Sequence, residues 1–175
     1  MSGRTDLIDR MIALLPRLRR FALTLTRNPA DADDLAQSAI ERALSRLDTW
    51  KEDSRLDSWL FKIMQNHWID QVRAKRVRGA EASDFDLALL AGDDGREIAE
   101  TRLTLKATLE AVMRLPDEQR AAMLLVVVDG FSYREAADIL EIPIGTVMSR
   151  LSRARQSLEA SVYGAGGRSP SEAVQ

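Results

Sequence analysis

Cysteine is absent from the sequence, and histidine occurs once, at His67. Without cysteine the chain has no disulfide, no thiolate metal site and no cysteine nucleophile. A single histidine also excludes a metal site built from several imidazoles, and no glycine-rich phosphate loop is present. No set of residues suggests a catalytic site. We therefore expect no enzyme activity, no catalytic residues, no metal and no cofactor.

Long apolar runs are also absent. No stretch approaches the roughly 20 apolar residues that a membrane-spanning helix needs. Residues 1–10 mix charged and apolar side chains, which is unlike a signal peptide. Hydrophobic residues make up 45% of the chain and charged residues 30%, the composition of a globular protein. We expect a cytoplasmic protein with no membrane insertion.

The net charge is only −2, but the charges are unevenly distributed. Residues 62–78 contain five basic side chains and one acid, whereas residues 81–100 contain seven acids and one arginine. Residues 144–156 contain three arginines and no acid. Two basic segments separated by an acidic one allow a nearly neutral chain to contact nucleic acid at two places.

Apolar residues recur at steps of three and four in every convincing periodic segment, so the fold class is all-α. Pro16 lies inside the first such segment and predicts a break between two short helices. Asp31 is expected to cap the next helix, whose apolar stripe covers 35–47. Asp57 is expected to cap another helix, with an apolar side at 60–72.

In the C-terminal half the helical period resumes near residue 98 and is interrupted at Pro116. A helix is expected from about 117 to 128, with Gly130 in the left-handed position that follows a helix end. The composition divides the chain into two small helical domains, joined by a flexible acidic linker. The expected boundaries are 1–78 for the first domain, 79–97 for the linker, 98–162 for the second domain and 163–175 for a disordered tail.

The sharpest motif lies near the C-terminus. Ser132 and Glu135 form a capping box for a short helix over 133–140, and the turn 141–143 leads to a longer helix. A short helix, a tight turn and a longer helix form the helix-turn-helix unit that reads DNA. An ordinary amphipathic helix pair is the alternative. The absence of acids from 144 to 157 favours DNA binding.

The final helix separates apolar from polar residues. One face carries Val147, Leu151, Ala154 and Leu158, and the other carries Met148, Ser149, Ser152, Arg153 and Gln156. Such a helix has an apolar back that holds it and polar side chains that can reach base edges in the major groove. Arg150 and Arg155 flank the polar face and suit phosphate contacts.

These motifs resemble those of the extracytoplasmic-function (ECF) sigma factors of bacterial RNA polymerase, within the sigma-70 superfamily. Similarity to the sigma-four domain is carried by 115–120, 131–137, 142–147 and 149–155. Similarity to the sigma-two domain is carried by 28–37, 59–63, Asn66 and Asp70. The resemblance covers roughly residues 8–160. Glu141, Met148 and Ala36 depart from the usual pattern.

The resemblance implies an alternative sigma factor that binds core RNA polymerase and directs promoter recognition, DNA opening and initiation for a stress-responsive regulon. The implied partners are the clamp helices of the largest subunit, the beta flap, promoter DNA and an anti-sigma factor. Two alternatives stay open: a stand-alone helix-turn-helix regulator, which would dimerise on paired half-sites, and a sigma mimic that binds only an anti-sigma factor.

The resemblance also implies site residues. The polymerase-binding residues are Asp31, Asp33, Asp34, Gln37 and Glu41, although acids in a first turn also stabilise any helix. The minus-10 residues are Trp50, Lys51, Arg55, Lys62, Asn66, Arg73, Lys75 and Arg76. The minus-35 residues are Thr146, Met148, Ser149, Arg150, Ser152, Arg153 and Arg155. Trp59 and Trp68 are expected in the core, and His67 is assigned no chemistry.

Overall fold

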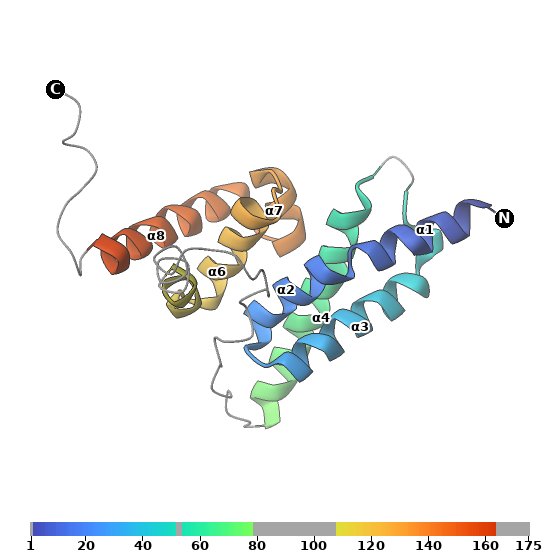
Figure 1. The fold of residues 1–175 in the computed structure, drawn as a ribbon, viewed down its shortest axis with the longest axis horizontal. Helices are drawn as coiled ribbons and strands as arrows, with labels where there is room; N and C mark the ends of the chain where they lie inside the picture. The colour runs from blue at the N-terminus through green and yellow to red at the C-terminus, as the bar shows by residue number, and fades with distance from the viewer. Residues whose placement is uncertain (1, 52–53, 79–107, 164–175) are drawn as a thin grey trace, which may run out of the picture.

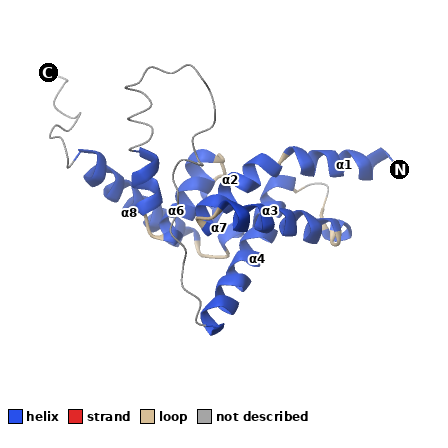
Figure 2. Ribbon diagram, turned by 60° about the horizontal axis from the view of Figure 1, so that its bottom comes forward, coloured by secondary structure: helices blue, strands red, loops and turns tan. Residues whose placement is uncertain are grey.

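The computed structural model describes residues 2–51, 54–78 and 108–163, and these residues form helices and loops without a strand (Figures 1 and 2). The first domain consists of α1 (Ser2–Ala13), α2 (Leu15–Thr26), α3 (Pro29–Leu44), the 3-10 turn η1 (Leu47–Thr49) and α4 (Leu56–Arg78). The second domain contains helical residues 108–114, α6 (Asp117–Met123), η3 (Leu124–Val128), α7 (Tyr133–Leu140) and α8 (Ile144–Tyr163).

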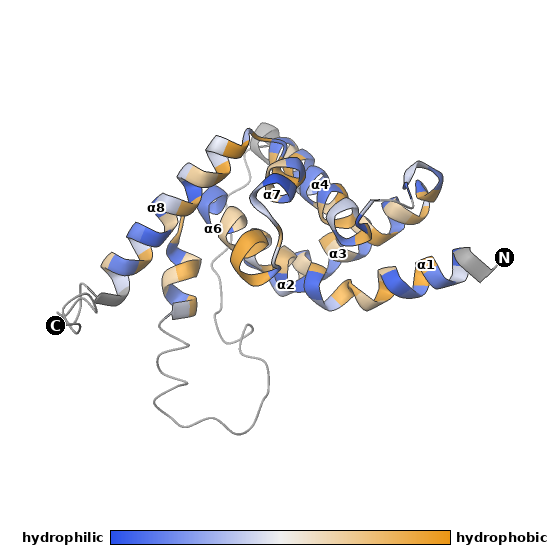
Figure 3. Ribbon diagram, turned by 90° about the horizontal axis from the view of Figure 1, so that it is seen from above, coloured by the Kyte–Doolittle hydropathy of each residue, from blue (hydrophilic) through white to orange (hydrophobic). Residues whose placement is uncertain are grey.

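The first domain packs α2, α3 and α4 around a shared apolar core (Figure 1). Its fully buried side chains come from all four helices: Met11, Leu18, Phe21, Leu35, Leu60, Phe61 and Met64. Apolar and polar residues alternate around these helices, so each can bury one side (Figure 3). The small residues Ala32, Ala36 and Ala39 of α3 are buried as well. Small side chains at such positions allow neighbouring helices to approach closely.

The break predicted at Pro16 is confirmed, because α1 ends at Ala13 and α2 begins at Leu15 with proline in its first turn. The cap predicted for α3 is wrong. Asn28, not Asp31, precedes the helix, and its side chain accepts a hydrogen bond of 3.1 Å from the Asp31 backbone N–H. Pro29 fixes the first helical position, which places the cap one residue before it.

Asp57 likewise does not precede its helix but lies in the first turn of α4. Its carboxylate accepts hydrogen bonds from Arg17 at 3.2 Å and from Arg55 at 2.7 Å. Burial works against ionisation, but these hydrogen bonds and that from the Ser58 backbone N–H hold the pKa of Asp57 below its usual range. The Asp57 side chain therefore links α4 to α2 instead of capping a helix.

The second domain contains the predicted helix-turn-helix. The helix expected over 117–128 is α6 continued by a π-helical segment, η3. Gly130 follows it at φ +72°, as predicted. The capping box is present in both directions, since Ser132 Oγ accepts from the Glu135 N–H and the Glu135 carboxylate accepts from the Ser132 N–H.

The two domains are in contact. α6 packs against α2, and α7 packs against α4. The ring of Phe61 lies 5.4 Å from that of Phe21 and 5.1 Å from that of Phe131 of the second domain, measured between centroids. Their buried residues form one apolar cluster. The sequence analysis predicts two domains joined by a flexible linker, and in the structure the two domains also meet through this row of three rings.

Charged side chains also connect the two domains. Arg17 bridges the domains by binding Asp129 at 3.1 Å as well as Asp57, and Arg20 also reaches Asp129, at 3.2 Å. Arg27 pairs with Asp117 at 3.1 Å. The acidic linker 79–97, the helical pattern from 98 to 107 and the tail after Tyr163 lie outside the described residues.

Candidate nucleic-acid interface

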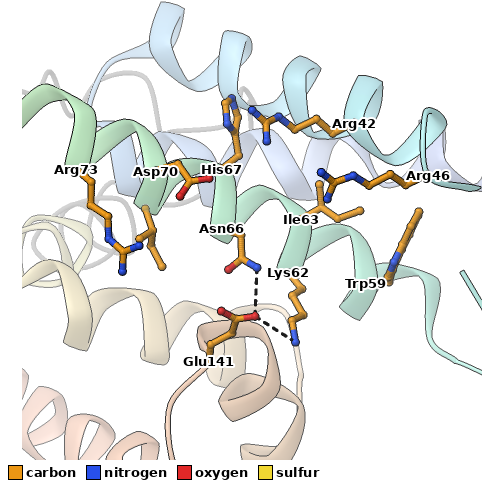
Figure 4. Close-up of a pocket in the computed structure, with 11 residues that line it drawn as sticks. Arg42, Arg46, Trp59, Lys62, Ile63, Asn66, His67, Asp70, Arg73 and Glu141 are labelled. Atoms are coloured by element: carbon orange, nitrogen blue, oxygen red, sulfur yellow. Dashed lines mark hydrogen bonds and ion pairs between the residues drawn. The ribbon is translucent and has the colours of Figure 1, made fainter. Parts of the chain in front are cut away.

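A basic cavity of about 600 Å³ lies between α3, α4 and the turn after α7 (Figure 4). It is lined by Arg42, Arg46, Trp59, Lys62, Ile63, Asn66, His67, Ile69, Asp70, Arg73 and Glu141. Four of these side chains are permanently cationic and two are acidic. An open cavity with this excess of positive charge suits an anionic strand.

The His67 ring contributes little positive charge at neutral pH. Burial, together with the nearby Arg42, lowers the pKa of His67 below its ordinary value. The sequence prediction that His67 carries no chemistry is compatible with this half-buried neutral ring. The positive charge of the cavity therefore comes from its arginines and from Lys62.

Glu141 enters the cavity from the second domain. Its carboxylate accepts a hydrogen bond of 3.2 Å from the Asn66 amide and lies 3.4 Å from Lys62 Nζ (Figure 4). The Asn66 hydrogen bond and, more weakly, Lys62 lower the pKa of Glu141. Glu141 is thus an anion already bound at the predicted minus-10 residues.

The structure brings together only part of the predicted minus-10 set. Lys62, Asn66 and Arg73 line the cavity, whereas Arg55 lines a second, smaller one beside Arg10 and Asp57. The guanidinium carbon of Arg10 lies 6.0 Å from the centre of the Trp50 ring. The buried indole N–H of Trp50 has no hydrogen-bond partner among the described residues. Lys51 is exposed, and the side chains of Lys75 and Arg76 lie outside the described part.

Arg42, Arg46 and Trp59 belong to the cavity but were not predicted. Arg42 lies in the last turn of α3, and Arg46 follows it in the turn that leads to η1. No helical spacing links the two arginines, although their closeness in the sequence could have indicated a basic patch. Trp59 was expected in the core, and it is half-buried where it lines the cavity.

The α8 helix presents the surface predicted for the minus-35 element. Val147, Leu151 and Ala154 are buried and hold the helix against α6 and α7. The predicted residues that are exposed are Met148, Ser152, Arg153 and Arg155. Thr146 and Ser149 are half-buried, and the Ser149 hydroxyl donates to the Thr146 carbonyl. Arg150 is tied to Glu118 of α6 at 2.6 Å.

The predicted polymerase-binding residues occupy one side of α3. Asp33, Asp34, Gln37 and Glu41 are exposed, while Asp31 is half-buried in the first turn. Asp33 forms a two-point pair with Arg19 at 2.6 and 2.8 Å. Gln37 donates to Glu41 at 2.9 Å. The side is acidic and amide-bearing, opposite in charge to the cavity at the end of α3.

A helix-turn-helix unit with an exposed polar recognition face, attached to a second helical domain with a basic cavity, defines a DNA-binding protein of the transcription machinery. Comparison with known families specifies it further. The family model for sigma-70 region 2 matches residues 11–78, and that for sigma-70 region 4 matches residues 105–158.

The chain is 38% identical over 158 residues to the ECF RNA polymerase sigma factor EcfG of Rhodopseudomonas palustris, covering 90% of this chain and 86% of that protein. It is 32% identical to the ECF sigma factor SigW of Bacillus subtilis, covering 75% of each. This chain belongs to the ECF sigma factors of the sigma-70 family. It is an alternative sigma factor that binds core RNA polymerase and promoter DNA.

Solved structures show the same fold. The sigma factor RpoE of Bartonella quintana, determined in complex with the anti-sigma factor NepR, is similar with a TM-score of 0.76 and 30% identity, over 93% of this chain and 99% of that one. CnrH in complex with the cytosolic domain of CnrY matches with a TM-score of 0.64 at 24% identity, which shows the fold alone. In the described part of the chain, none of the helices has the length and apolar character to span a bilayer.

Proposed function

We propose that this sigma factor reads the minus-35 element with the exposed face of α8. The observation that carries the assignment is the separation of that helix into a buried and an exposed side. Arg153 and Ser152 are exposed opposite Val147 and Leu151, which are buried. A recognition helix needs this arrangement, because its base-reading side chains must leave the protein surface while its back stays packed.

The minus-10 strand is proposed to bind at the basic cavity. Lys62, Asn66 and Arg73 line it together with Arg42 and Arg46. A displaced single strand needs cationic groups along its backbone and a surface for unstacked bases. The cavity supplies the cations, and the half-buried ring of Trp59 at its edge supplies an aromatic surface. Lys51, Arg55 and Trp50 extend the proposed surface toward the loop before α4.

Core polymerase is proposed to dock on the acidic side of α3, through Asp33, Asp34, Gln37 and Glu41. An exposed acidic face complements a basic coiled coil such as the clamp helices. The proposed boundaries of the polymerase- and DNA-binding domains are residues 1–78 and 98–162. The chain performs no reaction of its own in this proposal and acts in the cytoplasm, where the chromosome and polymerase lie.

An anti-sigma protein is the proposed regulator. The RpoE of Bartonella quintana, to which this chain is similar over nearly its whole length, is complexed with the anti-sigma factor NepR. A free sigma factor would compete for polymerase continuously, so a masking partner is expected here as well. It is proposed to be a separate protein that contacts both domains.

Run-off transcription with purified core polymerase on genomic fragments tests the proposal. Polymerase with this protein should produce transcripts from defined start sites, and polymerase alone should not. The variant Arg153→Ala should lose most of these transcripts, whereas Arg134→Ala, on the exposed side of α7, should retain them. A protein that binds paired DNA sites as a dimer without polymerase, and starts no transcript with it, would instead be a stand-alone regulator.

A further inference from the structure

Two acids of the helix-turn-helix domain bind residues that we assign to the minus-10 strand. Glu141 contacts Lys62 at 3.4 Å and Asn66 at 3.2 Å (Figure 4). Glu135 binds Arg55 Nη1 at 2.8 Å. Both carboxylates therefore lie where phosphates of a bound strand would be expected, since carboxylate and phosphate use the same cationic and amide donors.

The backbone of Glu141 suggests that its side chain has a role. Glu141 adopts the left-handed backbone conformation with φ +53°, which costs less free energy for glycine or asparagine than for glutamate. No contact of its carboxylate within its own domain appears among the described residues. A glutamate kept in a conformation that favours glycine, with a side chain that reaches only the other domain, points to a function for that contact.

The observed arrangement of the domains cannot engage a whole promoter. The minus-10 and minus-35 elements lie about 25 base pairs apart, or about 85 Å at roughly 3.4 Å per base pair. In the structure the α7–α8 turn lies within hydrogen-bond distance of α4. The domains must therefore separate before both elements can be bound, and this separation removes Glu135 and Glu141 from α4.

We propose that α7 and the turn after it form an intramolecular mask, in which Glu135 and Glu141 occupy the strand-binding cations of the first domain while the chain is free. This inference rests on the proposed minus-10 site. The mask and the DNA strand exclude one another. The apparent affinity of the free protein for single-stranded DNA is therefore the affinity of the open form multiplied by the fraction of molecules that is open. The free sigma factor is thereby kept from binding single strands before polymerase separates its domains.

The test compares two double variants of the full-length chain. Glu135→Gln with Glu141→Gln removes both negative charges, and glutamine preserves the capping box. Asp138→Asn with Glu159→Gln removes the same charge from exposed positions of the same domain and serves as the control. Binding is measured by fluorescence anisotropy with a labelled single-stranded 20-mer of mixed sequence.

The E135Q/E141Q variant should bind the oligonucleotide about three- to tenfold more tightly than the control, the combined size of a few partly exposed ion pairs. Adding Arg55→Ala, Lys62→Ala and Asn66→Ala to both proteins should remove the difference in affinity between them. Glu141→Gly, which also relieves the backbone, should act in the same direction. Equal affinities of E135Q/E141Q and the control would overturn the mask.

Run-off transcription with Lys62→Ala and Asn66→Ala separates the mask from the site on which it rests. Reduced transcription supports the minus-10 assignment, so that equal affinities in the binding assay would then count against the mask alone. Unchanged transcription would overturn the minus-10 assignment and the mask together.

Discussion

Arg120 has no exposed surface, yet each of its guanidinium nitrogens has a partner. Nε donates to the Thr24 carbonyl at 2.7 Å, Nη1 to the Leu115 carbonyl at 2.8 Å, and Nη2 to the Asp117 carboxylate at 2.6 Å. Burial lowers the pKa of Arg120, and the hydrogen bond to Asp117 acts in the opposite direction. The guanidinium stays charged at neutral pH, as arginine does in proteins. Because Thr24 belongs to α2, this side chain ties the second domain to the first.

Replacing Arg120 with Met should keep the volume filled but leave buried carbonyls without donors. Each unsatisfied buried group costs about 1–3 kcal/mol, so we expect the free energy of unfolding to fall by at least that amount. Urea unfolding followed by circular dichroism measures it. Arg134→Met, at an exposed position of α7, is the control and should change stability little. Equal stability of the two variants would contradict the bridging role.

Arg153 and Arg150 should differ in how they affect promoter binding. Arg153 is exposed on α8, so Arg153→Ala should cost about 1–3 kcal/mol of minus-35 binding and relax specificity at one base pair. Arg150 is held by Glu118 beside the polar face, so Arg150→Ala should weaken all promoters alike and reduce the salt dependence. Binding to a panel of minus-35 duplexes at several salt concentrations distinguishes the two. A uniform loss in both variants would show that the base-reading face is wrongly assigned.

Individual helices were predictable where their signals are local. The capping box at Ser132, the break at Pro16 and the left-handed Gly130 each depend on neighbours within a few residues, and all three are present. The caps of α3 and α4 were misplaced because several acids and amides near a helix start are equally suited to capping. For α4, Asp57 faces Arg17 of α2, a partner 40 residues away that no local pattern identifies.

The basic cavity could be predicted only in part, because three separate elements build it. The basic residues of α4 stood out in the sequence, whereas Arg42 and Arg46 join them only when α3 packs alongside. Glu141 arrives from the second domain. In the sequence Glu141 was visible as a departure from the family pattern in the turn, but its partners depend on how the domains meet.

At the scale of a helix, the exposed side of α3 should contribute to polymerase binding without contributing to the fold. Asp34 and Gln37 are exposed, and the only described side-chain contact of Gln37 is with Glu41. Changing both to alanine should weaken binding to core polymerase while helicity and the melting temperature stay nearly unchanged. Surface plasmon resonance against immobilised core gives the affinity, with Asp138→Ala on α7 as the control. An unchanged affinity would remove the docking assignment.

The contact between the domains combines apolar and charged interactions that lie far apart in the sequence. The side chain of Asp129 is buried and pairs with Arg17 and Arg20, which are partly exposed, while the side chains of Glu135 and Glu141 are more exposed than that of Asp129. The buried ring of Phe131 provides most of the attachment, since partly exposed ion pairs contribute about 0.2–1 kcal/mol each. The exposed acids instead make the contact sensitive to pH and salt.

Closure of the two domains should weaken in acid. Burial works against ionisation of Glu135, but the hydrogen bonds with Ser132 and the nearby Arg55 lower its pKa, and Asn66 and Lys62 lower the pKa of Glu141. Of these partners only Arg55, Asn66 and Lys62 belong to the other domain, so only their contributions are lost when the domains separate. A carboxyl whose pKa is lower in the closed form than in the open form stabilises the closed form at pH values above its ordinary pKa of about 4.3. It loses that contribution as the pH falls through its pKa in the closed form.

Fluorescence energy transfer between labels at Ser45→Cys and Ser157→Cys measures this closure, because the chain has no other cysteine. The transfer efficiency should fall as the pH drops below the ordinary glutamate pKa of about 4.3. The decrease should be smaller when Glu135 and Glu141 are both glutamine. The same decrease in both proteins would show that Glu135 and Glu141 do not control the separation.

The row formed by Phe21, Phe61 and Phe131 has a consequence for the lifetime of the protein in the cell. When the domains separate, Phe61 loses its neighbour at 5.1 Å and both rings meet water. Burying one such ring is worth about 1.5–3 kcal/mol, and a newly exposed pair is a site for aggregation and for quality-control proteases. A molecule that opens without polymerase to receive it should therefore be degraded sooner than one that stays closed. The aromatic contact thus links the abundance of this sigma factor to the supply of core polymerase.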